Sequence, residues 1–158
     1  MTMSIHLASL FLTTAVLVST TSAPTQTATP TDHDKSIDLS VGDHTKVHQI
    51  LTELQQAVAK HNAPAVAALV HYPIKVNPGK HPITIKTPKA FIKDYDSIIT
   101  HDISDVILKQ KYEALFVNSQ GVMLGDGEVW ITGFCLDKNC KNSGIKIGTI
   151  QDTKNLKP

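Results

Sequence analysis

The chain has 158 residues, enough for one domain with an apolar core and too few for two. Its 15 basic and 14 acidic residues nearly balance and form no block of like charge, so the sequence shows neither a nucleic-acid-binding footprint nor a polybasic membrane anchor. All 15 basic residues are lysine. Without arginine the chain has no guanidinium group that could bind phosphate or carboxylate through two hydrogen bonds. This weakens any interpretation as a nucleotide-binding or phosphopeptide-binding protein.

The N-terminal residues are typical of an export signal followed by a tether. The apolar stretch "IHLASLFLTTAVLVS" has signal-peptide length, is too short for a convincing membrane span, and precedes the small residues "TTSA" that end at Ala23. We expect residues 1–23 to be a cleaved signal peptide that leaves no membrane anchor, and the mature protein to be periplasmic or secreted. Residues 24–39 are rich in threonine and proline, which predicts a flexible linker to a folded domain over residues 40–155.

Two helices are predicted at the start of this domain. Ser40 is the expected N-cap of the first helix, with Asp43 three residues later. Apolar residues then recur at spacings of three and four, which gives one buried stripe. Its members are Val47, Ile50, Leu51, Leu54 and Val58. The second helix is expected to start at Asn62 as N-cap, with Pro64 in its first turn, and to end before Pro73.

The rest of the chain changes from short extended pieces to a helix and then to strands. Residues 74–77 and 83–85 are expected to form a small hairpin, and Thr87 to cap a helix whose first position is Pro88. After residue 110 the apolar period moves towards two, which predicts three antiparallel strands in "KYEALFVN", "GVMLGDGEVWITGF" and "IKIGTIQD". This order predicts an α+β domain with N-terminal helices packed on one face of a curved antiparallel sheet.

The stretch "GDGE" at residues 125–128 is open to three interpretations. A calcium loop needs alternating oxygen ligands over a longer stretch, and a phosphate loop needs a helix after its glycines, whereas "VWI" follows here. We therefore predict that Gly125 and Gly127 bend one long strand.

The predicted bend assigns side chains to the two faces of that strand. Asp126, Glu128 and Trp130 would project from one face, whereas Met123 and Val129 would project from the other, as would Ile131. On a concave face the acidic pair and the tryptophan would line a pocket. On a convex face they would be ordinary surface, and the sequence leaves both arrangements open.

The two cysteines carry a firmer indication. In an exported chain Cys135 and Cys140 predict a disulfide that closes the connection "CLDKNC", since a redox motif has a shorter spacing and a zinc site needs further ligands. His44 and His48 lie one helical turn apart, but the glutamate of the zinc-peptidase motif is missing and no third ligand can be assigned. No metal site and no cofactor is therefore predicted.

Several stretches together resemble one family. The segments "ALVHYPIKVN", "TPKAFIKDYDSII", "LFVNSQGVMLGDGEVWI" and "GIKIGTI" are similar to the cone-shaped α+β NTF2-like superfamily, in small exported bacterial proteins, over about residues 45–152. Members of this superfamily include pocket enzymes, such as SnoaL-like cyclases and ketosteroid isomerases, and binding modules without catalysis. Candidate ligand-binding residues in such a cone are Tyr72, Tyr95, Asp126, Glu128 and Trp130.

The resemblance is compatible with either a binding module or an enzyme. The enzymes place an acid/base dyad in the cone, for which the candidates are His71, Tyr72, Tyr95, Asp96, Asp126 and Glu128. No dyad motif matches, so no catalytic residue is assigned. We expect a non-catalytic exported domain that holds a small apolar or amphipathic ligand in the cone or a cell-envelope protein at its rim. The alternative is a cofactor-free acid/base enzyme of isomerase, cyclase or hydratase type. No nucleic-acid partner is expected, and a homodimer through the sheet is considered beside these partners.

The export signal predicts a defined mature N-terminus. Intact-mass spectrometry of protein purified from the exporting cell should find a chain that starts between Ser22 and Thr25, because cleavage follows small residues. Recovery of a cytoplasmic chain that keeps Met1 would contradict this prediction.

Overall fold

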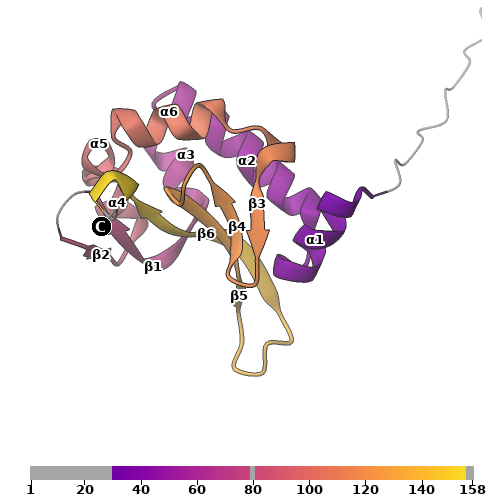
Figure 1. Ribbon diagram of the computed structural model, residues 1–158. Coiled ribbons are helices and arrows are strands. Elements are labelled where there is room, and N and C mark those ends of the chain that lie inside the picture. The colour runs from indigo at the N-terminus through magenta and orange to yellow at the C-terminus, as the bar shows by residue number, and fades with distance from the viewer. Residues whose placement is uncertain (1–29, 79–80, 156–158) are drawn as a thin grey trace, which may run out of the picture.

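The computed structural model describes residues 30–78 and 81–155 (Figure 1). The predicted signal peptide and residues 24–29 of the predicted linker lie outside this range. The helices are α1 (Asp32–Val41), α2 (His44–Ala59), α3 (Ala63–Ala68), α4 (Pro88–Lys93), α5 (Tyr95–Ile98), α6 (His101–Lys109) and the short 3₁₀ turns η1 (Tyr112–Ala114) and η2 (Thr153–Asn155). The strands are β1 (Val70–Asn77), β2 (Ile83–Ile85), β3 (Phe116–Asn118), β4 (Gly121–Leu124), β5 (Val129–Cys135) and β6 (Ser143–Gln151). The α+β class is thereby confirmed.

Helix α1 corrects the predicted start of the folded domain. Residues 32–39, predicted as linker, are helical because Thr31 and Asp34 form a capping box and Gly42 ends the helix with a left-handed backbone at φ 101°. Ile37 is fully buried and joins the core, whereas Leu39 is 90% exposed. The domain therefore begins at the first turn of α1 and not at residue 40.

The predicted first helix is α2, with a different cap. Asp43 is its N-cap, and its side chain accepts a hydrogen bond from the Lys46 N–H at 3.0 Å. Ser40, the predicted cap, lies in α1 and donates to the carbonyl oxygen of Asn118 at 2.6 Å. All five residues of the predicted apolar stripe are buried, so the prediction of its inward face is confirmed.

After α2 the observed helix is shorter, and the observed strand longer, than predicted. Asn62 caps α3 as expected, but the helix ends at Ala68 and β1 begins at Val70. Pro73 lies inside β1, after a cis peptide bond with Tyr72, and does not end a helix. The hairpin of β1 with β2 is confirmed, and the helix predicted from Thr87 divides into α4 and α5 at Asp94.

The six strands form one open, mixed sheet in the order β2-β1-β6-β5-β4-β3. Strand β1 runs parallel to β6, so the sheet is not wholly antiparallel as predicted. The remaining neighbours pair antiparallel. The chain thus contributes four strands after α6, where three were predicted.

The fourth strand arises because "GDGE" is a turn and not a bend inside one strand. Leu124 pairs with Val129, which leaves residues 125–128 as the connection between β4 and β5. Gly125 and Gly127 have φ of 63° and 114°, values that reverse the chain and that residues with a side chain rarely adopt. The prediction that the glycines serve backbone geometry holds, but the geometry is that of a hairpin.

The helical assignment of residues 32–39 gives a direct test. Ile37→Ala should lower the free energy of unfolding by about 2 to 5 kcal/mol, because it leaves a cavity under α1. Leu39→Ala, two positions along the same helix, should change it by no more than about 0.5 kcal/mol, because Leu39 is exposed. Chemical denaturation of both variants measures the difference in the free energy of unfolding. Equal effects of the two substitutions would contradict a packed helix over residues 32–39.

Candidate functional site

One face of the sheet is filled by the helices. The inner strands contribute Val122, Leu124, Val129, Ile131, Ile147 and Ile150 to this face, none of them more than 1% exposed. They belong to a single apolar cluster with residues of α2, α3, α4 and α6. None of the described charged or histidine side chains is buried. A catalytic carboxylate or histidine tuned by burial is therefore absent from the described residues.

The opposite face carries a row of side chains that crosses all six strands. Directly paired residues share a face, and the pairs Phe116 with Met123, Met123 with Trp130, and Trp130 with Thr149 continue to Lys75 and then to Thr84. We call this face the open sheet face. It is defined by Phe116, Met123, Trp130, Thr149, Lys75 and Thr84, together with Thr132, Phe134 and His71. Phe116 is 53% exposed, so the row ends in an aromatic ring open to solvent.

Strand β5 extends the open sheet face at right angles to this row. The ring of Phe134 stacks on the imidazole of His71 with centroids 3.7 Å apart and planes 4° from parallel. The two residues lie on β5 and β1, on either side of β6. The stack crosses β6 at Gly148, where a Cβ would lie 2.9 Å from the Phe134 ring. His71, a candidate for the acid/base dyad, is thus part of an aromatic surface on the sheet.

The predicted tyrosines do not belong to this face. Tyr72 and Tyr95 flank Phe91, each with its ring centroid 6.4 Å from that of Phe91. The Tyr72 hydroxyl donates to the Ala67 carbonyl oxygen at 3.0 Å, and burial raises the pKa of Tyr72 to about 12. Burial also raises the pKa of Tyr95, which is 4% exposed. Tyr95 is a member of the buried core, and Tyr72 packs against that core, partly buried.

The predicted carboxylates lie elsewhere again. Glu128 accepts hydrogen bonds from the backbone N–H of Asp126 at 2.7 Å and from the hydroxyl of Thr153. It therefore ties the β4–β5 turn to η2, while Asp126 is exposed. Asp96 is on the surface, 3.1 Å from His61. The five predicted ligand-binding residues thus divide among the core, the turn and the open sheet face, where only Trp130 lies.

The register of the sheet explains what the sequence analysis missed. Met123 was expected on the face opposite Trp130, but it pairs directly with Trp130 and shares its face. The assignment failed because the strand is interrupted at residues 125–128. The alternation within β5 alone, Trp130, Thr132 and Phe134, was a usable signal for this face.

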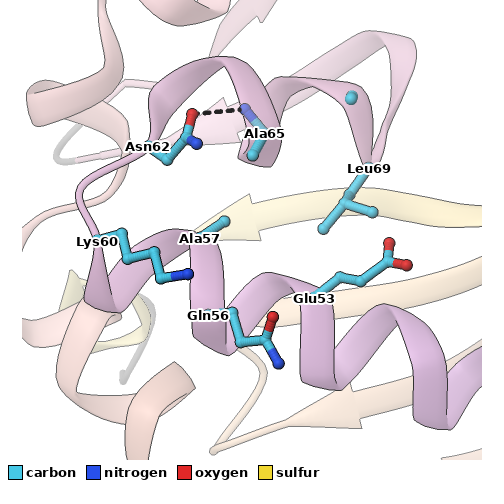
Figure 2. Close-up of a pocket in the computed structure, with 8 residues that line it drawn as sticks. Glu53, Gln56, Ala57, Lys60, Asn62, Ala65 and Leu69 are labelled. Atoms are coloured by element: carbon cyan, nitrogen blue, oxygen red, sulfur yellow. Dashed lines mark hydrogen bonds between the residues drawn. The ribbon is translucent and has the colours of Figure 1, made fainter.

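Surface grooves differ in the chemistry that they offer. A groove of about 350 Å³ lies between α2 and α3 (Figure 2). It is lined by Glu53, Gln56, Ala57, Lys60, Asn62, Ala65, Ala68 and Leu69. The Asn62 side chain there accepts from the Ala65 N–H at 3.1 Å and so serves as a helix cap. A hollow of about 410 Å³ on the open sheet face combines the Trp130 indole with amide and hydroxyl groups. It is lined by Gln120, Trp130, Thr132, Thr149 and Gln151.

The histidines of α2 hold the N-terminal helix in place. His44 Nδ1 lies 2.9 Å from the Asp38 carboxylate, and this hydrogen bond raises the pKa of His44. The Tyr112 hydroxyl donates to Asp34 at 2.7 Å, which lowers the pKa of Asp34 to about 2. The His48 ring packs edge-on against Tyr112 with centroids 4.7 Å apart. The two imidazoles have separate partners, and the described residues contain no group of three or more potential metal ligands.

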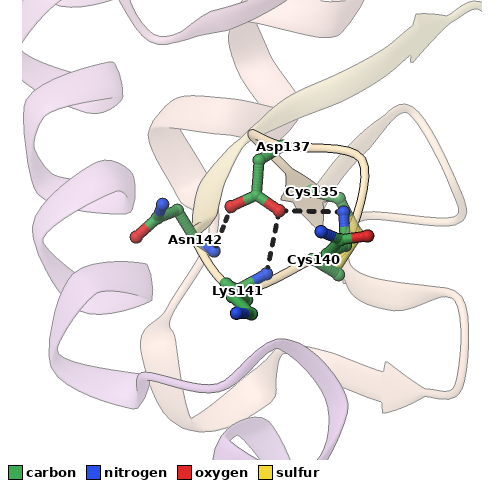
Figure 3. Close-up of a disulfide and its surroundings, with 6 residues drawn as sticks. Cys135, Asp137, Cys140, Lys141 and Asn142 are labelled. Carbon is green, nitrogen blue, oxygen red and sulfur yellow. Dashed lines mark hydrogen bonds between the residues drawn. A yellow bond between two sulfur atoms is a disulfide. The ribbon is translucent and has the colours of Figure 1, made fainter.

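The predicted disulfide is confirmed. Cys135 and Cys140 are bonded in the connection between β5 and β6, with Cα atoms 4.6 Å apart (Figure 3). Inside this connection the Asp137 carboxylate accepts the backbone N–H groups of Asn139 at 2.9 Å, Lys141 at 3.1 Å and Asn142 at 2.7 Å. These bonds hold the pKa of Asp137 below its usual value. In Figure 1 the connection projects beyond the rest of the domain.

Comparison with known proteins leaves the family open. No protein-family model matches the sequence, no curated protein matches it, and no solved structure matches the chain. The NTF2-like relation therefore stays a prediction, and the architecture itself defines an α+β domain with one open sheet face. None of the helices in the described ranges is long and apolar enough to cross a membrane.

The turn provides a test between a structural and a metal-binding role. Glu128→Ala should lower the free energy of unfolding by about 1 to 3 kcal/mol, because backbone and hydroxyl donors lose their acceptor. Asp126→Ala, the matched control, should stay within about 0.5 kcal/mol. Thermal melts with calcium and with chelator complete the test. A calcium-dependent rise in Tm that Asp126→Ala abolishes would make the turn a metal site.

Proposed function

We propose that the protein is an exported, non-catalytic binding module of the NTF2-like kind, and that its open sheet face binds a protein of the cell envelope. The element order supports the family proposal, since a helical pair, a short hairpin, further helices and a run of strands follow one another as the resemblance implies. The disulfide is compatible with an oxidising, extracytoplasmic location.

The observation that carries the binding proposal is the row Phe116, Met123 and Trp130 on a face that the helices do not fill. Aromatic and methionine side chains are enriched at the centres of protein interfaces, where they provide contact area at low entropic cost. The neighbouring Thr132 and Thr149 add hydroxyl groups that can pair with a partner's polar groups. A polar rim around an apolar centre is the ordinary anatomy of an interface.

The packing of the helix-covered face of the sheet favours a protein partner over a small ligand held in the cone. Its side chains form one apolar cluster with the helices, and the two predicted tyrosines are packed within it around Phe91. A ligand between helices and sheet would have to displace these contacts. Of the predicted carboxylates, Asp126 and Glu128 lie at the turn and Asp96 lies on the surface, all outside the cluster, so no observation favours the acid/base enzyme over the binding module.

Site-specific crosslinking tests the proposal. Phe116 is replaced by the photoreactive p-benzoylphenylalanine, which keeps an aromatic ring at an exposed position. Leu108 on α6, which is 43% exposed on the helical layer, is the matched control position. Irradiation of the exporting cell should yield one discrete adduct from position 116 and none from position 108, and mass spectrometry identifies the attached protein.

Two results would overturn the proposal. Equal adducts from both positions would show contact without a preferred face. An adduct of twice the protein's own mass, with peptides of this chain on both sides, would show that the open sheet face forms a homodimer instead.

A further inference from the structure

The hairpin tip beyond β5 is continuous with the open sheet face. Leu136 is the first residue after β5, and its side chain contacts Gly144, the partner of Phe134 in β6, so it lies beside the line of Trp130, Thr132 and Phe134. The Leu136 side chain lies over Gly144, 3.5 Å from where a Cβ would be, yet it is 65% exposed. The aromatic surface therefore continues onto the projecting connection of Figure 1 and ends there in an exposed leucine.

The tip is held in one conformation by contacts within itself. The Cys135–Cys140 bond closes the loop, the Leu136 N–H donates to the Asn142 carbonyl oxygen at 2.8 Å, and Asp137 accepts its backbone N–H groups from the inside (Figure 3). A loop that is ordered before binding loses less conformational entropy on association. The tip therefore meets a partner in an already ordered conformation.

The charge of this surface has one sign. The six strands contain no aspartate or glutamate, and their charged residues are Lys75 and Lys146. The tip adds Lys138 and Lys141, which are exposed and form no ion pair within the described chain. The tip's carboxylate, Asp137, is directed towards the backbone N–H groups of Lys141 and Asn142 within the loop. Two such faces set against each other would both carry positive charge, whereas an acidic partner would complement the lysines.

We propose that the partner of the open sheet face is an acidic protein, and that the disulfide-closed hairpin enters a concavity on it. Leu136 contacts an apolar pocket, and Lys138 and Lys141 face carboxylates on the pocket's rim. This inference rests on the proposed function and adds to it the chemistry of the partner and the element that recognises it.

A charge-reversal experiment with a second crosslinking position tests the inference. p-Benzoylphenylalanine at Asn139, which is exposed at the tip, should give an adduct with the same protein that position 116 captures. Lys138→Glu with Lys141→Glu should reduce both adducts by about tenfold or more, because like charges then oppose each other. Lys89→Glu with Lys93→Glu on α4 changes the net charge equally at exposed positions and should leave both adducts unchanged.

The outcomes separate this inference from the proposed function. An adduct at position 116 with none at 139, or adducts that survive the tip reversal, would overturn the hairpin inference and leave the sheet-face proposal standing. The absence of adducts at both positions would overturn both proposals. An adduct between two copies of this chain would replace both proposals with a homodimer. If the reversed variant melts below wild type, Lys138→Gln with Lys141→Gln is measured instead. Fragment spectra of the 139 adduct should place the link in a segment rich in aspartate and glutamate, and a lysine-rich segment would contradict the inference.

Discussion

The parallel pairing of β1 with β6 is the contact on which the rest of the structure depends. It joins residues 70–77 to residues 147–151, and backbone bonds from Ile147 to Leu69 at 2.9 Å and from Asp152 to Asn77 at 2.7 Å secure its two ends. Without it the β1–β2 hairpin and the strands from β3 to β6 would be separate pieces with separate apolar faces. A parallel pair needs a long crossover, and here that crossover contains α4, α5, α6 and the four strands from β2 to β5. Closing so long a loop costs chain entropy, and burial of the core that both halves share has to offset that cost.

Local signals in the sequence were enough for several elements. The apolar stripe of α2, the Asn62 and Thr87 caps and the disulfide each depend on residues a few positions apart, and each is present in the structure. Helix α1 escaped prediction because it buries only Ile37 fully and gains its attachments from Tyr112 and Asn118, which are distant in sequence. Mostly polar segments carry no periodicity from which such contacts could be inferred.

The candidate site was less accessible to sequence analysis. Trp130 was a candidate ligand-binding residue in the sequence analysis, but its neighbours are fixed by strand register, which pairs it with Met123 and Thr149. Glycines beside acidic residues are compatible with a bend, a turn or a loop for ions. Pairing of Leu124 with Val129 decides among these, and that pairing is a property of the folded sheet. The tyrosines were plausible ligands by type, and their packing around Phe91 in the core could be seen only in three dimensions.

The contour of the open sheet face is set in part by an absent side chain. At Gly148 a single methyl group would stand 2.6 Å from the Thr132 hydroxyl oxygen and 2.9 Å from the Phe134 ring, too close for either to remain where it is. The ring would have to rise from the imidazole of His71, and a level patch would become a ridge. Shape complementarity at an interface is sensitive to differences of this size. Position 148 can therefore alter the fit of a partner without contacting it, through the height of the rings on either side of it.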